Sequence, residues 1–244
     1  MPDDKQVALI TGAARGIGLA IARRLLEDGF RVIMLDRNAT TVTAEARAFA
    51  QDQQPVEGVG IDITDRASVA ALIGRLDRLD VLVNNAAVFW DGHFEKATEQ
   101  DFTAMFEVNV VGSFIVAQEA AKRLPRGGRI INVASRAFLA GRVHAAYTAS
   151  KSAVVGLTRA MAVDLAERGI FVNCVAPGLI ETDMFRSLTP ARQDELIALQ
   201  PTGTIGQPDD IANAVAFFAA PRTRYLTGQI MIVDGGRSLG VSSY

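Results

Sequence analysis

Short apolar runs recur along the chain, and longer stretches with the spacing of amphipathic helices separate them. The hydrophobicity of each run is continuous rather than alternating, which is typical of parallel strands that are buried on both faces. The intervening helical stretches are long enough for right-handed crossovers between such strands. The pattern therefore predicts an α/β fold, a doubly wound parallel sheet with helices on both faces. Its seven strands are expected at residues 7–10, 32–35, 56–61, 81–83, 130–133, 171–175 and 230–233.

Glycines mark the expected ends of two helices in this pattern. Gly29 follows the first helical stretch, and Gly169 follows a stretch expected to be helical from 147 to 168. Each lies where a left-handed C-terminal cap forms. No internal repeat, low-complexity tract or linker interrupts the alternation of strands and helices. We therefore expect residues 1–244 to form a single domain.

Residues 179–207 interrupt the alternation of strands and helices after the sixth expected strand. The segment is rich in proline and glycine and contains one short helical stretch, 191–199. In a doubly wound sheet, ligands bind beyond the carboxyl ends of the strands, which is where this segment begins. We expect the excursion to act as a substrate loop or lid, although a solvated insertion is consistent with the same sequence.

Composition and charge narrow the class of protein. Apolar residues make up 49% and charged residues 21% of the chain, which is ordinary for globular proteins and excludes a disordered chain. The formal net charge of -2 is spread over interspersed acids and bases, so we expect no partner among nucleic acids or anionic membranes. No apolar run approaches the roughly 20 residues of a membrane-spanning helix. A small molecule is therefore the expected partner.

Cysteine and histidine are scarce in this sequence. Cys174 is the only cysteine, which excludes an internal disulfide, and a buried, inert thiol is expected within its apolar strand. The polar start of the chain lacks the apolar core of a secretory signal, so we expect a cytoplasmic protein. His93 and His144 have no partners at metal-ligand spacing, and no metal site is expected.

A glycine-rich segment, residues 11–18, joins the first expected strand to the helix that follows it. Within it, Gly12 permits a tight turn, Gly16 lets the backbone approach a pyrophosphate, and Gly18 lets the helix pack closely on the strand. The helix N-terminus attracts the same anion. Arg15 and Ile17 flank the second of these glycines. The context predicts a dinucleotide-binding loop rather than a purely structural turn.

The end of the second expected strand bears on the choice between NAD and NADP. Asp36 lies where a carboxylate accepts hydrogen bonds from the adenosine ribose hydroxyls and repels a 2′-phosphate. Arg15 and Arg37 are placed where a guanidinium neutralises such a phosphate. An arginine can turn outward to solvent, whereas the carboxylate cannot share its place with a dianion. NAD is therefore favoured over NADP as the cofactor.

Tyr147 and Lys151 form the candidate chemical site. A spacing of four residues near the start of a helix puts the phenol and the ammonium group on one face, where both can act on one substrate. Chance produces this spacing often enough that it is weak evidence by itself. Whether this spacing marks a catalytic site depends on the other motifs of the chain.

Over nearly its whole length, the chain resembles the short-chain dehydrogenase/reductase superfamily. The motifs that carry the resemblance, in the family's order, are the glycine loop, Asn84-Asn85-Ala86-Ala87, Asn109, Ser135, Tyr147 with Lys151, and Pro177-Gly178. Two features depart from the family pattern. Ala87 stands where the family usually has glycine, and the interval from Ser135 to Tyr147 is one residue shorter, which affects the substrate loop. The resemblance implies a Rossmann-type sheet of strand order 3-2-1-4-5-6-7 and an NAD(P)-dependent oxidoreductase.

The resemblance implies a role for each residue of the candidate catalytic site. Tyr147 is the base in alcohol oxidation and the acid in carbonyl reduction. Because free tyrosine titrates at about pH 10, its phenolate needs the charge of Lys151, which also holds the nicotinamide ribose. Ser135, at the carboxyl end of a strand, holds the substrate oxygen, and Asn109 holds a water in a proton relay from Lys151. Further cofactor contacts are implied for Asp62, Ile63, Asn85, Ala86, Tyr147, Pro177, Gly178, Ile180 and Thr182.

Three functions remain open on this sequence. The first is hydride transfer between the nicotinamide and a secondary alcohol or ketone, such as a small alcohol, a polyol or a cyclic alcohol. The second is reduction of 3-oxoacyl thioesters on an acyl-carrier protein with NADPH, which Asp36 argues against. The third is a non-catalytic nucleotide-binding regulator, which has little reason to retain the whole catalytic set.

Several residues near the expected site have more than one interpretation. An apolar substrate wall, or packing in the core, is expected for Phe89, Trp90, Met184, Phe185 and Leu188. Arg136 or Arg142 pairs with a substrate carboxylate, or is an ordinary surface arginine. By analogy with the family, we also expect a homotetramer formed through the helices near 102–121 and 147–168.

Overall fold

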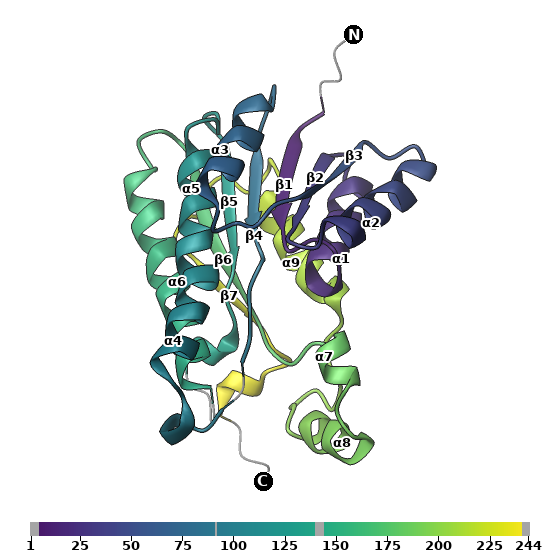
Figure 1. The fold of residues 1–244 in the computed structure, drawn as a ribbon, viewed down its shortest axis with the longest axis vertical. Coiled ribbons are helices and arrows are strands. Elements are labelled where there is room, and N and C mark those ends of the chain that lie inside the picture. The colour runs from purple at the N-terminus through teal and green to yellow at the C-terminus, as the bar shows by residue number, and fades with distance from the viewer. Residues whose placement is uncertain (1–4, 91, 140–143, 241–244) are drawn as a thin grey trace.

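The computed structural model describes residues 5–90, 92–139 and 144–240. Seven parallel strands form one sheet in the order β3-β2-β1-β4-β5-β6-β7 (Figure 1). Each lies within two residues of its expected bounds, and both the doubly wound fold and the strand order are confirmed. The strands are β1 (Val7–Thr11), β2 (Arg31–Asp36), β3 (Val56–Gly60), β4 (Val81–Asn84), β5 (Arg129–Val133), β6 (Phe171–Pro177) and β7 (Ile230–Val233).

Helices cover both faces of the sheet, which explains why the strands are apolar at successive positions. In β1, Ala8 and Ile10 belong to one hydrophobic core, and Val7 and Leu9 belong to the other. The first core is completed by α1 (Gly16–Glu27), α2 (Ala39–Gln51) and α9 (Pro208–Ala219). The second core is completed by α3 (Arg66–Arg75), α5 (Ser113–Ala121) and α6 (Ala145–Asp164). Figure 1 shows the two helical layers on opposite sides of the strands.

The helix expected at 102–121 consists of three consecutive segments. The α4 helix (Glu99–Phe106) passes through a π-helical segment, η2 (Glu107–Gly112), into α5. Because the wider π turn changes the rotation of the side chains, it changes which of them face the sheet. Among the residues of this segment, Asn109 and Gly112 are buried.

Both expected glycine caps form, but the helix before the second one ends earlier than expected. Gly29 has φ +89° and follows the end of α1, with the backbone N–H of Phe30 bonded to the carbonyl of Leu25, as expected. Gly169 has φ +69°, but α6 ends at Asp164, four residues before its expected end. A turn covers the interval, and it is closed by bonds from the N–H of Gly169 to Ala166 and from that of Ile170 to Leu165, the same spacing as at Gly29.

Residues 179–207 leave the sheet after β6 and return to it before α9. They contain α7 (Asp183–Arg186) and α8 (Pro190–Ala198), which lie beyond the carboxyl ends of the strands (Figure 1). The two ends of this segment are joined by a β-bridge between Ile180 and Gly206, where the N–H of Glu181 donates to the carbonyl of Gly206 at 2.8 Å; we call these paired ends the neck of the excursion. Throughout the described ranges, no helix is long and apolar enough to cross a membrane.

Candidate active site

The glycine loop between β1 and α1 has a shape that side chains would disrupt. Gly12 and Gly16 have φ values of +65° and +54°. A Cβ on Gly12 would lie 2.7 Å from the Cα of Ala86, and one on Gly18 would lie 2.0 Å from the carbonyl oxygen of Gly12. A Cβ on Gly16 would meet only the Thr182 side chain, at 3.8 Å. The loop is therefore packed tightly against β4 and α1, and it is open only above Gly16.

Hydrogen bonds between Thr11 and Asn85 fix the loop relative to the segment after β4. The hydroxyl oxygen of Thr11 accepts from the backbone N–H groups of Asn85 and Ala86, both at 3.0 Å. The side-chain amide of Asn85 donates to the carbonyls of Thr11 and Gly12, also at 3.0 Å. Two segments that are distant in sequence thus form one rigid edge.

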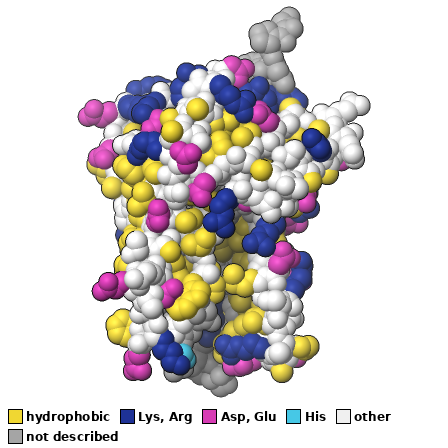
Figure 2. Space-filling view, viewed as in Figure 1, with side chains coloured by type: hydrophobic (Ala, Val, Ile, Leu, Met, Phe, Trp, Pro, Cys, Tyr) yellow, Lys and Arg dark blue, Asp and Glu magenta, His cyan; other side chains and the backbone are white. Residues whose placement is uncertain are grey.

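A cleft of about 670 Å³ lies along this edge. In Figure 1, α7 and α8 lie one above the other at the lower right. Figure 2, in the same view, shows a hollow beside them that is surrounded by hydrophobic side chains. Twelve of the expected cofactor-binding residues line the cleft: Gly12, Arg15, Gly16, Ile17, Gly18, Asp36, Arg37, Asp62, Ile63, Asn85, Ala86 and Thr182. A glycine cradle followed by a helix N-terminus and an elongated cleft fits a dinucleotide.

Six further lining residues were not predicted as cofactor contacts: Ile61, Ala87, Val88, Val108, Asp183 and Met184. Ile61, Ala87 and Asp183 are sequence neighbours of expected contacts, so adjacency could have indicated them. Val108 lies in the π-helical segment, whose register the sequence does not reveal. Met184, which was expected in a substrate wall, is 57% exposed at the mouth of the cleft.

Two aspartates in the cleft are held by backbone hydrogen bonds. The carboxylate of Asp36 accepts from the N–H of Ala14 at 3.2 Å and from that of Asn38 at 2.9 Å. The carboxylate of Asp62 accepts from the backbone and hydroxyl of Thr64, and these bonds lower its pKa. Neither carboxylate can turn away from the cleft without losing these bonds.

The candidate catalytic residues gather at the carboxyl end of β5 and the start of α6. Lys151 is almost fully buried, and its Nζ donates to the carbonyl oxygen of Val133 at 2.9 Å and lies 5.8 Å from the ring centroid of Tyr147. Burial lowers the pKa of Lys151 to about 8. Burial also raises the pKa of the Tyr147 phenol, and a side-chain hydrogen bond with Ser135 partly opposes this shift. The structure thus brings three of the four expected residues together.

Asn109 is connected to these three residues through the side chain of Ser150. Its Oδ1 accepts from the N–H of Val88 at 2.8 Å, and its Nδ2 donates to the carbonyl of Val88 at 3.0 Å and to the Ser150 hydroxyl at 3.1 Å. Ser150 in turn donates to the carbonyl of Tyr147 at 2.8 Å. Ser150 was not among the expected site residues, although it lies within the Tyr147–Lys151 interval. Asn109 therefore ties the segment after β4 to the first turn of α6.

The ring of Tyr147 contacts one member of the expected apolar wall, Phe89. Phe89 packs edge-on against it, with the ring centroids 4.9 Å apart, and packs similarly against His144. Trp90 is 44% exposed, whereas Phe185 is buried. The expected apolar wall is thus divided, since part of it packs in the core and part is open to a ligand.

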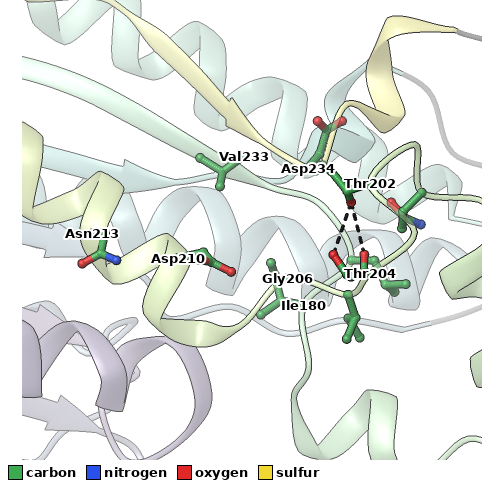
Figure 3. Close-up of a pocket in the computed structure, with 12 residues that line it drawn as sticks. Ile180, Thr202, Thr204, Gly206, Asp210, Asn213, Val233 and Asp234 are labelled. Atoms are coloured by element: carbon green, nitrogen blue, oxygen red, sulfur yellow. Dashed lines mark hydrogen bonds between the residues drawn. The ribbon is translucent and has the colours of Figure 1, made fainter.

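Five expected cofactor contacts do not line the large cleft: Tyr147, Lys151, Pro177, Gly178 and Ile180. Ile180 instead lines a second cavity of about 350 Å³ beneath the neck of the excursion. Figure 3 shows Ile180 and Gly206 on one side of it and Thr202 and Thr204 on another. Pro177 is the last residue of β6, and Gly178 packs against Asp234.

Other expectations concern residues outside the site or outside the described chain. Cys174 is fully buried, as expected, and burial raises the pKa of its thiol to about 11, which keeps it protonated. Arg142 lies outside the described residues. Within the described ranges, no group of three or more His, Cys, Asp or Glu side chains is arranged to hold a metal ion.

Comparison with known proteins identifies related chains of nearly the same length. A protein-family profile described as enoyl-(acyl carrier protein) reductase matches residues 12–238. The BbsD subunit of (2S)-[(R)-hydroxy(phenyl)methyl]succinyl-CoA dehydrogenase from Thauera aromatica is 41% identical, over 96% of this chain and 97% of that protein. The 3-oxoacyl-[acyl-carrier-protein] reductase FabG of Rickettsia bellii is 38% identical over 95% and 96%. A blue fluorescent protein from a metagenomic library, solved with NADPH, is 40% identical with a TM-score of 0.87, over 96% of this chain and 98% of that one.

Proposed function

Because this chain belongs to the short-chain dehydrogenase/reductase superfamily and is an NAD(P)-dependent oxidoreductase, we propose that it interconverts a secondary alcohol and a ketone. The observation that carries the proposal is the buried ammonium of Lys151, held at the carboxyl end of β5 beside the ring of Tyr147, whose phenol interacts with Ser135. When bound, the nicotinamide supplies or accepts the hydride. The whole chain acts as one dinucleotide-binding and catalytic domain, and residues 179–207 form its lid.

The roles of the side chains follow from their surroundings. Burial keeps the Tyr147 phenol protonated at rest, so it can donate its proton to the oxygen of a ketone in reduction. In oxidation it accepts the alcohol proton, and the positive charge of Lys151 stabilises the phenolate. Ser135 holds the substrate oxygen beside the phenol. Asn109 holds the relay water, and its bonds to Val88 and Ser150 fix the position of that water.

The pH dependence of reduction is expected to follow the ammonium of Lys151. Its pKa of about 8 means that the charge is present below this pH and is lost above it, while the raised pKa of Tyr147 keeps the phenol protonated. We expect kcat/KM for ketone reduction to be flat at low pH and to fall about tenfold per pH unit above 8. Lys151→Arg should move this limb to higher pH, because arginine stays charged. A limb that stays in place in that variant would contradict the assignment.

We propose NAD as the preferred cofactor. The twelve expected residues of the cleft hold it together with Pro177, Gly178 and Ile180 at the neck, and Tyr147 and Lys151 meet its nicotinamide ribose. Asp36 supports the choice of NAD, because two backbone N–H groups aim its carboxylate at the place of the adenosine ribose. Arg15 and Arg37 are exposed and free to turn toward solvent.

Asp36→Ser tests this preference. Losing hydrogen bonds to a charged group and the repulsion of a 2′-phosphate should raise the ratio of kcat/KM for NADP to that for NAD by about 10- to 100-fold. Asp52→Ser, an exposed change at the end of α2, should leave the ratio unchanged. If the native enzyme already uses NADPH more efficiently than NADH, the assignment of NAD is wrong.

Reduction of 3-oxoacyl thioesters is the second candidate function. The names of the Rickettsia and Thauera relatives, one an acyl-carrier-protein reductase and one a dehydrogenase of a CoA ester, favour it. It would use the same side chains. A panel of secondary alcohols, polyols, cyclic alcohols and 3-hydroxyacyl thioesters, each with NAD and NADP, separates the two. Membership of this enzyme family argues against the third candidate, a non-catalytic regulator.

We further propose that the protein assembles as a homotetramer through α4, α5 and α6. These helices expose large apolar side chains in the isolated chain, among them Phe102, Phe114 and Val163, the last of which is 76% exposed, and Val111 is exposed in the π-helical segment between α4 and α5. Such side chains favour burial against a second copy. Sedimentation equilibrium should report four times the chain mass.

A further inference from the structure

Two arginines lie at the carboxyl ends of β5 and β7, and the proposed chemistry does not use them. Arg136 directly follows Ser135 and begins the short helix η3 (Arg136–Phe138). Arg237 begins η4 (Arg237–Leu239) shortly after β7. Only β6 separates β5 from β7, so their ends lie about 10 Å apart. Two arginine side chains can approach each other across that distance.

The end of β6 lies between the two arginines and is covered by Asp234. Gly178 has no side chain, and a Cβ there would lie 2.5 Å from the Cβ of Asp234, which therefore leans over β6. The carboxylate of Asp234 accepts from the backbone N–H groups of Gly236 at 3.1 Å and Ser238 at 2.7 Å. In Figure 3 it points away from Thr202, toward η4. Asp234 thus holds the turn of η4 with both of its carboxylate oxygens.

The charge of Arg136 has no bonded partner among the described residues. Its guanidinium is half-buried, and neither a hydrogen bond nor a close ion pair holds it there. Burial lowers its pKa, the charge of Arg237 lowers it further, and Asp234 only partly opposes these effects. Arg237 donates to the carbonyl of Leu199 at 2.8 Å, at the end of α8. A partly desolvated cation beside a second cation costs folding free energy unless an anion completes the group.

We propose that Arg136, assisted by Arg237, binds a carboxylate of the substrate, so that hydroxy acids and oxo acids are preferred over neutral alcohols and ketones. This inference rests on the proposed function. A guanidinium pairs with a carboxylate through two parallel hydrogen bonds. Because consecutive Cα atoms lie about 3.8 Å apart, Arg136 starts one residue from the hydroxyl that holds the reacting oxygen. The carboxylate therefore lies only a few bonds from the carbinol carbon.

A matched pair of substrates tests the proposal. The native enzyme should oxidise 3-hydroxyhexanoate with a kcat/KM about 10- to 100-fold higher than that of 3-hydroxyhexanamide, which has the same chain without the charge. Arg136→Gln should abolish this preference by raising KM for the acid, while the amide is used as before. Arg136→Lys should keep part of the preference, because it keeps the charge. Arg222→Gln removes an exposed positive charge elsewhere and should change neither substrate.

Thermal unfolding provides a readout that does not depend on turnover. If Arg136 is built for a ligand, Arg136→Gln relieves repulsion and should unfold at the same temperature as the native protein or higher. Hexanoate, added with the cofactor, should raise the unfolding temperature of the native protein and not that of the variant.

The outcomes separate this inference from the proposed function. Equal use of acid and amide by the native enzyme, or equal loss of both in Arg136→Gln, overturns the carboxylate site and leaves the oxidoreductase assignment intact. A lower unfolding temperature for Arg136→Gln also overturns it, because the arginine is then structural. Absence of turnover on the whole alcohol and thioester panel counts against the proposed function instead.

Discussion

Replacing Tyr147 with phenylalanine is expected to lower kcat by a factor of about 10²–10⁴ in both directions, a much larger change than in the affinity for the cofactor. The variant loses only the phenolic oxygen, which is the atom that exchanges a proton with the substrate. The ring, its edge-on contact with Phe89 and its place above Lys151 are retained. Steady-state kinetics with the best substrate of the panel provide the measurement.

The matched control for this variant is Tyr225→Phe. The same oxygen is removed there from a phenol that is fully exposed, so kcat should stay within experimental error of the native value. If Tyr147→Phe retains more than a tenth of native turnover while Tyr225→Phe is normal, Tyr147 does not carry the proton.

Gly18→Ala should weaken cofactor binding by a factor of about 5 to 150, which corresponds to an overpacking cost of about 1–3 kcal/mol. Its Cβ would lie 2.0 Å from the carbonyl oxygen of Gly12 and 2.6 Å from the side-chain amide of Asn85. The glycine loop must move to relieve this contact, and with it the backbone groups that meet the pyrophosphate. Titration of NAD or NADP into the purified variant measures the loss.

Gly74→Ala is the control for substituting a glycine within a helix. Gly74 lies in α3, and a Cβ there would meet nothing within 4 Å. That change should leave cofactor affinity unaltered and raise stability slightly, because alanine is the better helix former. Native affinity in Gly18→Ala would mean that the loop does not form the cofactor cradle.

The fold could be predicted because its strongest signals are local. A strand buried on both faces must be apolar at every position, and all seven strands were found from this property. The lining of the cleft could also be predicted, because residues that directly follow parallel strands share one edge of the sheet. Asp36, Asp62 and Asn85 are placed there by their strands alone.

The parts that escaped prediction depend on contacts between distant segments. The π-helical turn that buries Asn109 has no sequence signature of its own, because it arises where the segment after β4 must meet α6. The link from Asn109 through Ser150 to Tyr147 joins residues 41 positions apart. The approach of Arg136 to Asp234 and Arg237 depends on the strand order and on the missing side chain of Gly178.

Transfer of an isotopic label tests the central claim most directly. The protein is incubated with a ketone and with reduced nicotinamide cofactor in which both hydrogens at C4 are deuterium, and the alcohol product is examined by mass spectrometry and NMR. The account predicts that one deuterium appears on the carbinol carbon, and that Tyr147→Phe forms this product far more slowly than Tyr225→Phe. Product without deuterium at that carbon, or equal rates in the two variants, would contradict it.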